Sequence, residues 1–381
     1  MKVVIAPQSY KGSISAIKVA EAIKEGILRV LPQTETILIP VADGGDGTLE
    51  TLVESTGGTI HKSNATDPLG NLIPAIWGTL GDNKTAIIEM ARISGLALVP
   101  SNKRNPYYTT SYGLGEIIRE ALDLNYRKFI IGIGGSATND GGAGMAQALG
   151  AKLTDINKRP LDFGGLALNK ITKIDISSID PRIHESEILV ACDVNNPLCG
   201  LNGASFVYGP QKGASPEMVK VLDEALYNFG TQLINDTGID IMETPGSGAA
   251  GGIGGGMVGF LNAQLKPGVD IVLDTLGFDK SLKNVNLVIT GEGQIDFQTV
   301  FSKAPIGVAK HAKKYNIPVI AICGSLGKNY QDVHSHGIDA VISIIPKPMT
   351  LKKATDNAYE LIANTSEQLF RVLKNGQLIN N

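Results

Sequence analysis

Hydrophobic residues in the first 55 positions follow two spacings, and these predict an alternation of strands and helices. Residues 2–6 form a short apolar run typical of a buried strand, and apolar residues then recur every three or four positions through residues 14–31, as on one face of a helix. A second apolar run at residues 36–40 and a helical pattern at residues 48–55 follow. This β-α-β-α order predicts a parallel sheet.

The last hundred residues repeat the pattern, whereas the middle of the chain departs from it. Residues 72–80 and 84–90 flank the turn Gly81-Asp82-Asn83 as the strands of an antiparallel hairpin do. Near the C-terminus the predicted strands are residues 287–290, 319–323 and 340–345, and the predicted helices are residues 304–314 and 351–374.

We therefore expect two α/β domains, because 381 residues exceed what one compact core usually supports. One is predicted to be a doubly wound parallel-sheet domain of the Rossmann or flavodoxin-like type, built from residues 1–65 and 286–381. Residues 66–285 would form an inserted mixed α/β domain. We expect the active site in the cleft between the domains, where closure could exclude water.

Composition narrows the class of partner. Hydrophobic residues make up 43% and charged residues 19% of the chain, which favours globular domains. The formal net charge of -3 gives no bulk attraction to nucleic acid or membranes, so we expect a small-molecule substrate. The apolar run before Pro7 is too short for a signal peptide, and the cysteines lack CxxC spacing, so we expect a cytoplasmic protein with reduced thiols. A homo-oligomer is possible, and the sequence does not decide the oligomeric state.

Glycine is concentrated in a few loops, although the chain contains 45 in all. Residues 134–142, here called the glycine loop, join a predicted strand to a predicted helix. Gly134 and Gly135 could present N–H groups to a phosphate beside the helix N-terminus, or the segment could be only a tight turn. The spacing Gly132-x-Gly134-x-x-Ala137 also matches a loose dinucleotide fingerprint, so a nicotinamide-dependent hydroxy-acid oxidoreductase is an alternative.

Acidic residues follow several predicted strands, at the edge where parallel sheets bind ligands. Residues 42–47, here called the acidic loop, contain Asp43 and Asp46, which could hold Mg²⁺. Asp46 could instead cap the following helix. Asp193 could orient or deprotonate a substrate hydroxyl, or it could only cap a turn.

Two further loops carry charge. Lys212 lies in the turn GPQKG and could bind phosphate or be a solvated surface lysine. The loop GEGQID at residues 291–296 contains Glu292 and Asp296, and Lys303 follows shortly after it. These three residues are candidates for a nucleotide or metal site.

Seven long segments carry a recognisable pattern along the chain: 6–12 (APQSYKG), 42–48 (ADGGDGT), 132–151 (GIGGSATNDGGAGMAQALGA), 191–198 (ACDVNNPL), 206–214 (FVYGPQKGA), 245–256 (PGSGAAGGIGGG) and 288–296 (VITGEGQID). Together, and in this order, they resemble the type 1 glycerate kinase family over essentially the whole chain. The resemblance implies phosphorylation of D-glycerate with ATP and Mg²⁺, most often to 2-phospho-D-glycerate. A 3-phosphate product and a non-catalytic two-lobed binding protein stay alternatives. Two residues depart from the family pattern: Gln8 stands where Asp is usual, and Ser302 where Gly is usual.

Positions on these motifs, together with the chemistry of phosphoryl transfer, suggest individual roles. Lys11 would neutralise phosphate and Asp193 would orient the C2 hydroxyl, while Asp43 and Asp46 would hold Mg²⁺. Arg104 matches the glycerate carboxylate, because a guanidinium group binds it bidentately. The other substrate-binding candidates are Ser9, Ser136, Thr138, Asn139 and Lys212, and the candidates for binding ATP or phosphate are Gly134, Gly135, Gly291, Glu292, Gly293, Asp296 and Lys303.

Overall fold

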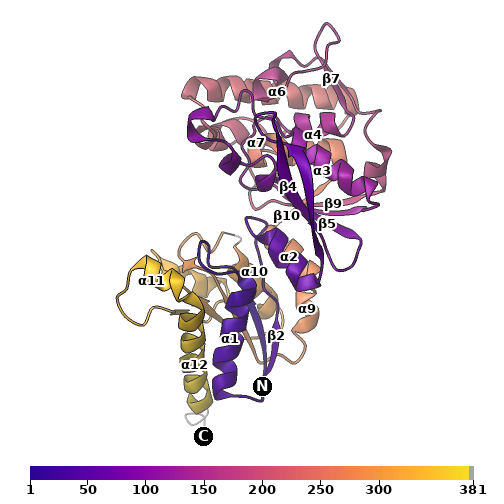
Figure 1. Ribbon diagram of the computed structural model, residues 1–381. Helices are drawn as coiled ribbons and strands as arrows, with labels where there is room; N and C mark the ends of the chain where they lie inside the picture. The colour runs from indigo at the N-terminus through magenta and orange to yellow at the C-terminus, as the bar shows by residue number, and fades with distance from the viewer. Residues whose placement is uncertain (302, 377–381) are drawn as a thin grey trace. The chain divides into compact units, whose positions relative to one another are not determined.

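The chain, described by a computed structural model, divides into two compact units (Figure 1). The first contains residues 1–43, 50–55 and those from 269 onward, and the second contains residues 44–49 and 56–268. The structure describes residues 1–301 and 303–376, so the departure at Ser302 lies outside the described residues. Within these residues, no helix is both long and apolar enough to cross a membrane.

The first unit contains a five-stranded parallel sheet to which both ends of the chain contribute. Its strands are β1 (Lys2–Pro7), β2 (Glu35–Leu38), β11 (Leu287–Gly291), β13 (Val319–Cys323) and β15 (Ala340–Ser343). They are ordered β15-β13-β11-β1-β2, and β1 pairs with β11 so that Val3 lies opposite Leu287. β11 and β13 are buried along their whole length, which agrees with their uninterrupted apolar sequences.

Helices pack against this sheet. In Figure 1, α1 and α12 lie side by side, and Arg29 on α1 forms an ion pair with Glu367 on α12 at 3.4 Å. The small strands β12 (Gln294–Ile295) and β14 (Ser325–Leu326) pair with each other. The helices are α1 (Ala16–Val30), α2 (Thr48–Thr56), α8 (Gly268–Thr275), α9 (Phe278–Ser281), α10 (Ala304–Lys313), α11 (Leu351–Asp356) and α12 (Ala358–Gly376), of which α2 and α8 include residues of both units.

The single helix expected over residues 351–374 is wrong, because the structure has α11 and α12 there. The break falls at Asn357, whose backbone has φ −113° and ψ 18°. The Asn357 side chain donates to Lys353 O at 2.8 Å, and such local bonds compete with helical ones. The apolar spacing of the two helices is continuous enough to hide this interruption.

The second unit contains a six-stranded mixed sheet. Its strands are β3 (Thr59–Thr66), β4 (Leu72–Thr79), β5 (Thr85–Glu89), β6 (Lys128–Gly132), β9 (Glu187–Ala191) and β10 (Gln264–Lys266), ordered β10-β9-β6-β5-β4-β3. The pairs β3–β4 and β4–β5 are antiparallel, which confirms the predicted hairpin, and the remaining pairs are parallel. Two α/β units, one with a parallel and one with a mixed sheet, confirm the predicted fold class.

Further elements cover or extend this sheet. The helices are α3 (Tyr112–Asp123), α4 (Ala143–Ala148), α5 (Ala204–Tyr208), α6 (Pro216–Thr237) and α7 (Ala249–Leu261), and β7 (Lys152–Thr154) pairs with β8 (Lys173–Asp175) outside the main sheet.

The two crossings between the units lie earlier in the chain than predicted. The chain enters the second unit before residue 65, and it returns to the first unit before residue 285. β3 belongs to the sheet of the second unit, where it pairs with β4 along its whole length. Its sequence TIHKSNAT is polar and only Ala65 is fully buried, so no apolar run marks it as a strand. At the other crossing, α8 belongs to the first unit from Val269 onward, where Val269 packs against Gly307 of α10.

Candidate active site

Two loops of the first unit meet at the carboxyl edge of its sheet. The loop after β1 carries Ser9 and Lys11, and the N–H of Gln8 at its start donates to the carbonyl of Gly291, the last residue of β11 (2.8 Å). A Cβ at Gly293 would lie 3.5 Å from the backbone nitrogen of Lys11. The structure therefore brings together predicted phosphate-binding residues from both ends of the chain.

Glu292 is a buried acid within this group. Its Oε1 accepts a hydrogen bond from the Thr299 hydroxyl at 2.8 Å, and Lys303 Nζ lies 3.9 Å from its Oε2. Burial raises the pKa of the Glu292 carboxyl to about 7; Asp43 and Asp296 also raise it, while Lys303 and Thr299 lower it. A carboxyl that is partly protonated near neutral pH repels a nucleotide phosphate less than an ordinary glutamate would.

Asp296 orders its own loop. Its Oδ1 accepts the N–H of Gln298 at 2.8 Å, and its Oδ2 accepts the side-chain amide of Gln294 at 2.9 Å. These bonds give Asp296 a local structural role in addition to the predicted one.

In the second unit, the start of α4 is occupied by the protein's own carboxylate. Asp140 is buried, and its Oδ2 accepts hydrogen bonds from Ser111 N and Oγ, both at 2.8 Å. The N–H groups of Gly142 and Gly144 also donate to Asp140. Burial raises the pKa of Asp140, and these hydrogen bonds oppose the shift. The expectation that the helix N-terminus is free for phosphate is therefore wrong.

The exposed part of the glycine loop lies before Asp140. Gly134 and Gly135 follow the end of β6 and are exposed. Helix α4 begins only at Ala143, well beyond Gly134, whereas a dinucleotide fingerprint opens its helix at the glycines themselves. The local geometry thus disagrees with the nicotinamide alternative.

Lys212 is a buried cation that orders the glycine loop. It is only 2% exposed, so the surface-lysine alternative is wrong. Its Nζ donates to Ser136 Oγ at 2.8 Å and to Thr138 O at 2.6 Å, and Ser136 Oγ in turn donates to Ala250 O at 2.9 Å. Burial lowers the pKa of Lys212 to about 7, while Asp140 opposes that shift.

The first residues of α7 enclose this lysine. Ala250, Gly251 and Gly252 all have positive φ, so the helix proper begins after them. A Cβ at Gly251 would lie 1.9 Å from Thr138 O and 2.8 Å from Lys212 Nζ. Only glycine allows this approach.

Several buried polar atoms near these loops have no hydrogen-bond partner among the described residues. Asn139 donates through Nδ2 to Ser205 Oγ at 2.9 Å, but its Oδ1 has no partner. Buried polar groups are nearly always satisfied, so such atoms indicate a place for a polar ligand or water. The other atoms are Ser94 Oγ, Arg104 Nε, Thr138 Oγ1 and Ser247 Oγ, and Arg104 and Thr138, like Asn139, are predicted glycerate-binding residues.

Asp193 lies close to the part of the acidic loop that belongs to the second unit. Its Oδ1 accepts the N–H of Gly268 at 2.9 Å, at the start of α8. A Cβ at Gly44, in the acidic loop, would lie 2.5 Å from Ala191 Cβ and 3.2 Å from Gly268 Cα. Asp193 therefore caps a helix and also lies close to the loop that contains Asp46.

The predicted Mg²⁺ ligands offer the right donor chemistry but only part of a coordination shell. No group of three or more His, Cys, Asp or Glu side chains within residues 1–301 and 303–376 is arranged to hold a metal ion. Mg²⁺ is commonly bound by one or two carboxylates, with water and substrate phosphate oxygens completing the octahedron. Asp43 and Asp46 fit such a substrate-completed site, so their role stays a prediction.

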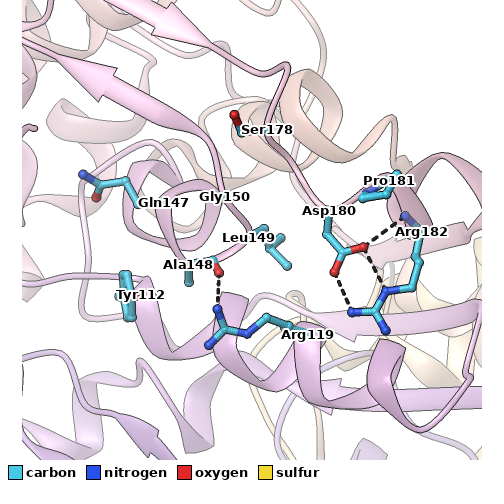
Figure 2. Close-up of a pocket in the computed structure, with 10 residues that line it drawn as sticks. All are labelled: Tyr112, Arg119, Gln147, Ala148, Leu149, Gly150, Ser178, Asp180, Pro181 and Arg182. Carbon is cyan, nitrogen blue, oxygen red and sulfur yellow. Dashed lines mark hydrogen bonds and ion pairs between the residues drawn. The ribbon is translucent and has the colours of Figure 1, made fainter.

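A pocket of about 440 Å³ in the second unit contains none of the predicted site residues. Figure 2 shows its two arginines bonded within the protein: Arg119 Nη1 donates to Ala148 O at 3.0 Å, and Arg182 pairs with Asp180 at 2.6 Å. We therefore do not assign this pocket to a substrate.

Comparisons with known proteins agree with these features. The model of the glycerate kinase family matches residues 3–374. The chain belongs to the glycerate kinase family. It is thus a kinase, and it is similar to "Glycerate kinase" of Haemophilus influenzae, with 51% identity over 98% of this chain and 99% of the relative. "Glycerate 2-kinase" of Escherichia coli is 50% identical over 99% of both chains. A crystal structure of a Salmonella typhimurium LT2 protein has a TM-score of 0.92 and 49% identity over 99% of both chains.

Two buried acids of this glycerate kinase family member are not among the residues that the sequence predicts for the site. Asp140 belongs to the glycine loop, and its role depends on Ser111, which lies outside that motif. Glu89 ends β5 and is 3% exposed. Its position after an apolar run is the same signal that identified Asp193, so the strand-end rule could have found it.

Proposed function

We propose that the protein transfers the γ-phosphate of ATP to the C2 hydroxyl of D-glycerate, giving 2-phospho-D-glycerate and ADP. The observation that carries this proposal is the 50% identity, over 99% of both chains, to a protein named glycerate 2-kinase. The local geometry supports it, because both sheets end in loops that carry groups suited to phosphate, carboxylate or hydroxyl. ATP is a cytoplasmic metabolite, so we place the reaction in the cytoplasm.

Residues of the second unit are assigned to glycerate. Arg104 would bind its carboxylate, since a guanidinium group offers two parallel donors. Thr138 Oγ1 and Asn139 Oδ1, which have no partner among the described residues, would bind its hydroxyl groups. Lys212 would act through Ser136 and Thr138, because its ammonium is buried beneath them.

Residues of the first unit are assigned to the nucleotide. Lys11 would neutralise phosphate charge, and the N–H groups of Gly291 and Gly293 would bind phosphate oxygens. Glu292, Asp296 and Lys303 would line the same site. Ser9 stays a candidate for binding glycerate, and Gly134 and Gly135 of the second unit stay candidates for binding phosphate through their N–H groups. Asp43 and Asp46 would hold Mg²⁺, which when bound would offset the negative charge of the transferred group.

The reaction balances without a covalent enzyme intermediate. The C2 oxygen forms a bond to the γ-phosphorus while the bond from that phosphorus to the bridging oxygen breaks, and ADP leaves. The hydroxyl proton passes to a base, for which Asp193 is the candidate. Because Asp193 Oδ1 accepts the Gly268 N–H, the orientation of its carboxylate is held by the backbone.

The test is an assay of purified protein with D-glycerate, ATP and Mg²⁺. We expect formation of ADP and a product whose ³¹P signal is split into a doublet by the single proton on C2. A triplet would identify the 3-phosphate and correct the position of transfer. Saturable glycerate binding without ADP release would refute the catalytic proposal and favour a binding protein.

A further inference from the structure

Glu89 makes two buried interactions at the end of β5. Its side chain is 4% exposed, and a buried carboxylate is costly unless both oxygens have partners. Oε1 accepts the backbone N–H of Leu49 at 2.9 Å, and Oε2 accepts Arg92 Nε. Both partners belong to the same unit as Glu89.

Leu49 lies in the first turn of α2, immediately after the acidic loop. The N–H groups of a first helical turn lack acceptors within the helix, and Glu89 supplies one from a neighbouring strand. A carboxylate at this place also interacts favourably with the positive end of the helix dipole. Glu89 thus fixes the end of the acidic loop relative to β5.

Other contacts hold the same loop against the neighbouring strands. Thr48 Oγ1 donates to Gly45 O at 2.7 Å, which closes a turn within the loop. The carbonyl of Gly44 would lie 2.6 Å from a Cβ at Gly132, the last residue of β6. Gly44 has φ +87° and approaches Ala191 at the end of β9, so a side chain has no space there. The loop therefore rests on the carboxyl ends of three strands, and Glu89 contributes a charged side chain to this support.

We propose that Glu89, held by Arg92, is a positioning residue that sets the acidic loop so that Asp43 and Asp46 can bind the metal of the metal–nucleotide complex. This inference rests on the proposed function, because it assumes that these carboxylates hold Mg²⁺. Glu89 acts through the backbone of Leu49 and contacts neither glycerate nor nucleotide in this scheme.

The test is Glu89→Gln, which keeps the size of the side chain and one acceptor oxygen. The Gln side chain has one acceptor oxygen and one NH₂ group. Whichever way the amide turns, its NH₂ faces either the Leu49 N–H or the Arg92 Nε–H, so one hydrogen bond is replaced by a contact between two donors. We expect the Mg²⁺ concentration for half-maximal rate to rise about tenfold, as for loss of one hydrogen bond to a charged group. The KM for glycerate should stay unchanged, and saturating Mg²⁺ should restore most of kcat.

Metal binding can also be measured without activity. Mn²⁺ is titrated into the protein in the presence of ADP, and the electron paramagnetic resonance signal of free Mn²⁺ reports how much metal is unbound. The dissociation constant should rise by a similar factor. If Glu89→Gln does not fold, as judged by circular dichroism, Arg92→Lys replaces it, because this change preserves the positive charge but removes the Nε donor. The same increase, of smaller size, is expected.

Glu116→Gln is the matched control. Glu116 lies on α3 in the same unit, and its Oε2 accepts the backbone N–H of Thr66 at 2.7 Å, so the variant likewise replaces the carboxylate acceptor of a backbone N–H by a neutral amide. Its Mn²⁺ and Mg²⁺ dependence should equal that of the wild type.

The outcomes separate the two proposals. A wild-type protein that does not phosphorylate glycerate overturns the proposed function. An active wild type whose metal affinity is weakened by Glu89→Gln and not by Glu116→Gln supports the inference. Equal effects of the two variants, or no effect of either, overturn it.

Discussion

Gly251→Ala should destabilise the protein far more than its backbone conformation alone would. Gly251 has φ +81°, and an added Cβ would lie 1.9 Å from Thr138 O. The carbonyl must then move, which breaks its 2.6 Å hydrogen bond from Lys212 Nζ. The left-handed conformation costs an alanine about 1–2 kcal/mol. Overpacking adds about 1–3 kcal/mol and loss of the charge-assisted hydrogen bond about 1.5–3 kcal/mol, so we expect a total of about 3.5–8 kcal/mol.

Gly238→Ala separates crowding from backbone strain. Gly238 ends α6 with φ +76°, and an added Cβ there would meet nothing within 4 Å. This variant should lose only about 1–2 kcal/mol. Urea unfolding of both variants and the wild type gives the free energies of unfolding, and glycerate phosphorylation should fall sharply only in Gly251→Ala. Equal destabilisation by the two substitutions would show that the segment around Thr138 yields without cost, and would refute the assigned packing.

Two further predictions concern acids of the proposed site. The pKa of Glu292 is raised to about 7 from 4.5, so between these pH values the folded state holds a proton that the unfolded state releases, and the free energy of unfolding falls as pH rises. Glu292→Gln should remove this slope, worth up to ~3 kcal/mol, in urea unfolding at pH 5 and pH 8; an unchanged slope would assign it to other groups. Asp193→Asn should lower kcat about 10²–10⁴-fold with little change in glycerate KM, whereas Asp43→Asn should be rescued by excess Mg²⁺. If excess Mg²⁺ rescues Asp193→Asn but not Asp43→Asn, the roles of general base and Mg²⁺ ligand must be exchanged between these two residues.

Strands that are buried uniformly could be predicted from an apolar run alone. Val3, Val4 and Ile5 are all inaccessible to solvent, and β11 and β13 are buried throughout, so an apolar run was a sufficient signal. β3 has no such run because it lies at an edge of the sheet and exposes polar side chains. Its position depends on pairing with β4, which the pattern within its own residues does not encode.

The candidate site also has residues that local sequence patterns predict and residues whose roles depend on distant parts of the chain. Strand ends and glycine-rich turns are local features, so the sequence could place Ser9, Asp43 and Asp193 at carboxyl edges. The role of Lys212 depends on Ser136, 76 positions away, and on α7, and its turn motif predicts neither contact. Likewise, the Asp140 carboxylate accepts a hydrogen bond from Ser111, which lies 29 positions earlier in the chain.

Glycines in the clustered loops allow close packing within the protein, in addition to any contact with a ligand. Glycine-rich loops commonly let the backbone approach a ligand, yet Gly44 and Gly251 approach other parts of the protein: Ala191 at the end of β9 and the carbonyl of Thr138. A side chain at either position would push a loop away from the sheet edge on which it rests. Glycine at these positions therefore acts before any ligand is bound, by letting loops pack closely enough for their polar groups to face the same place. The glycine-rich segments of this chain therefore have a packing role that does not depend on a bound substrate.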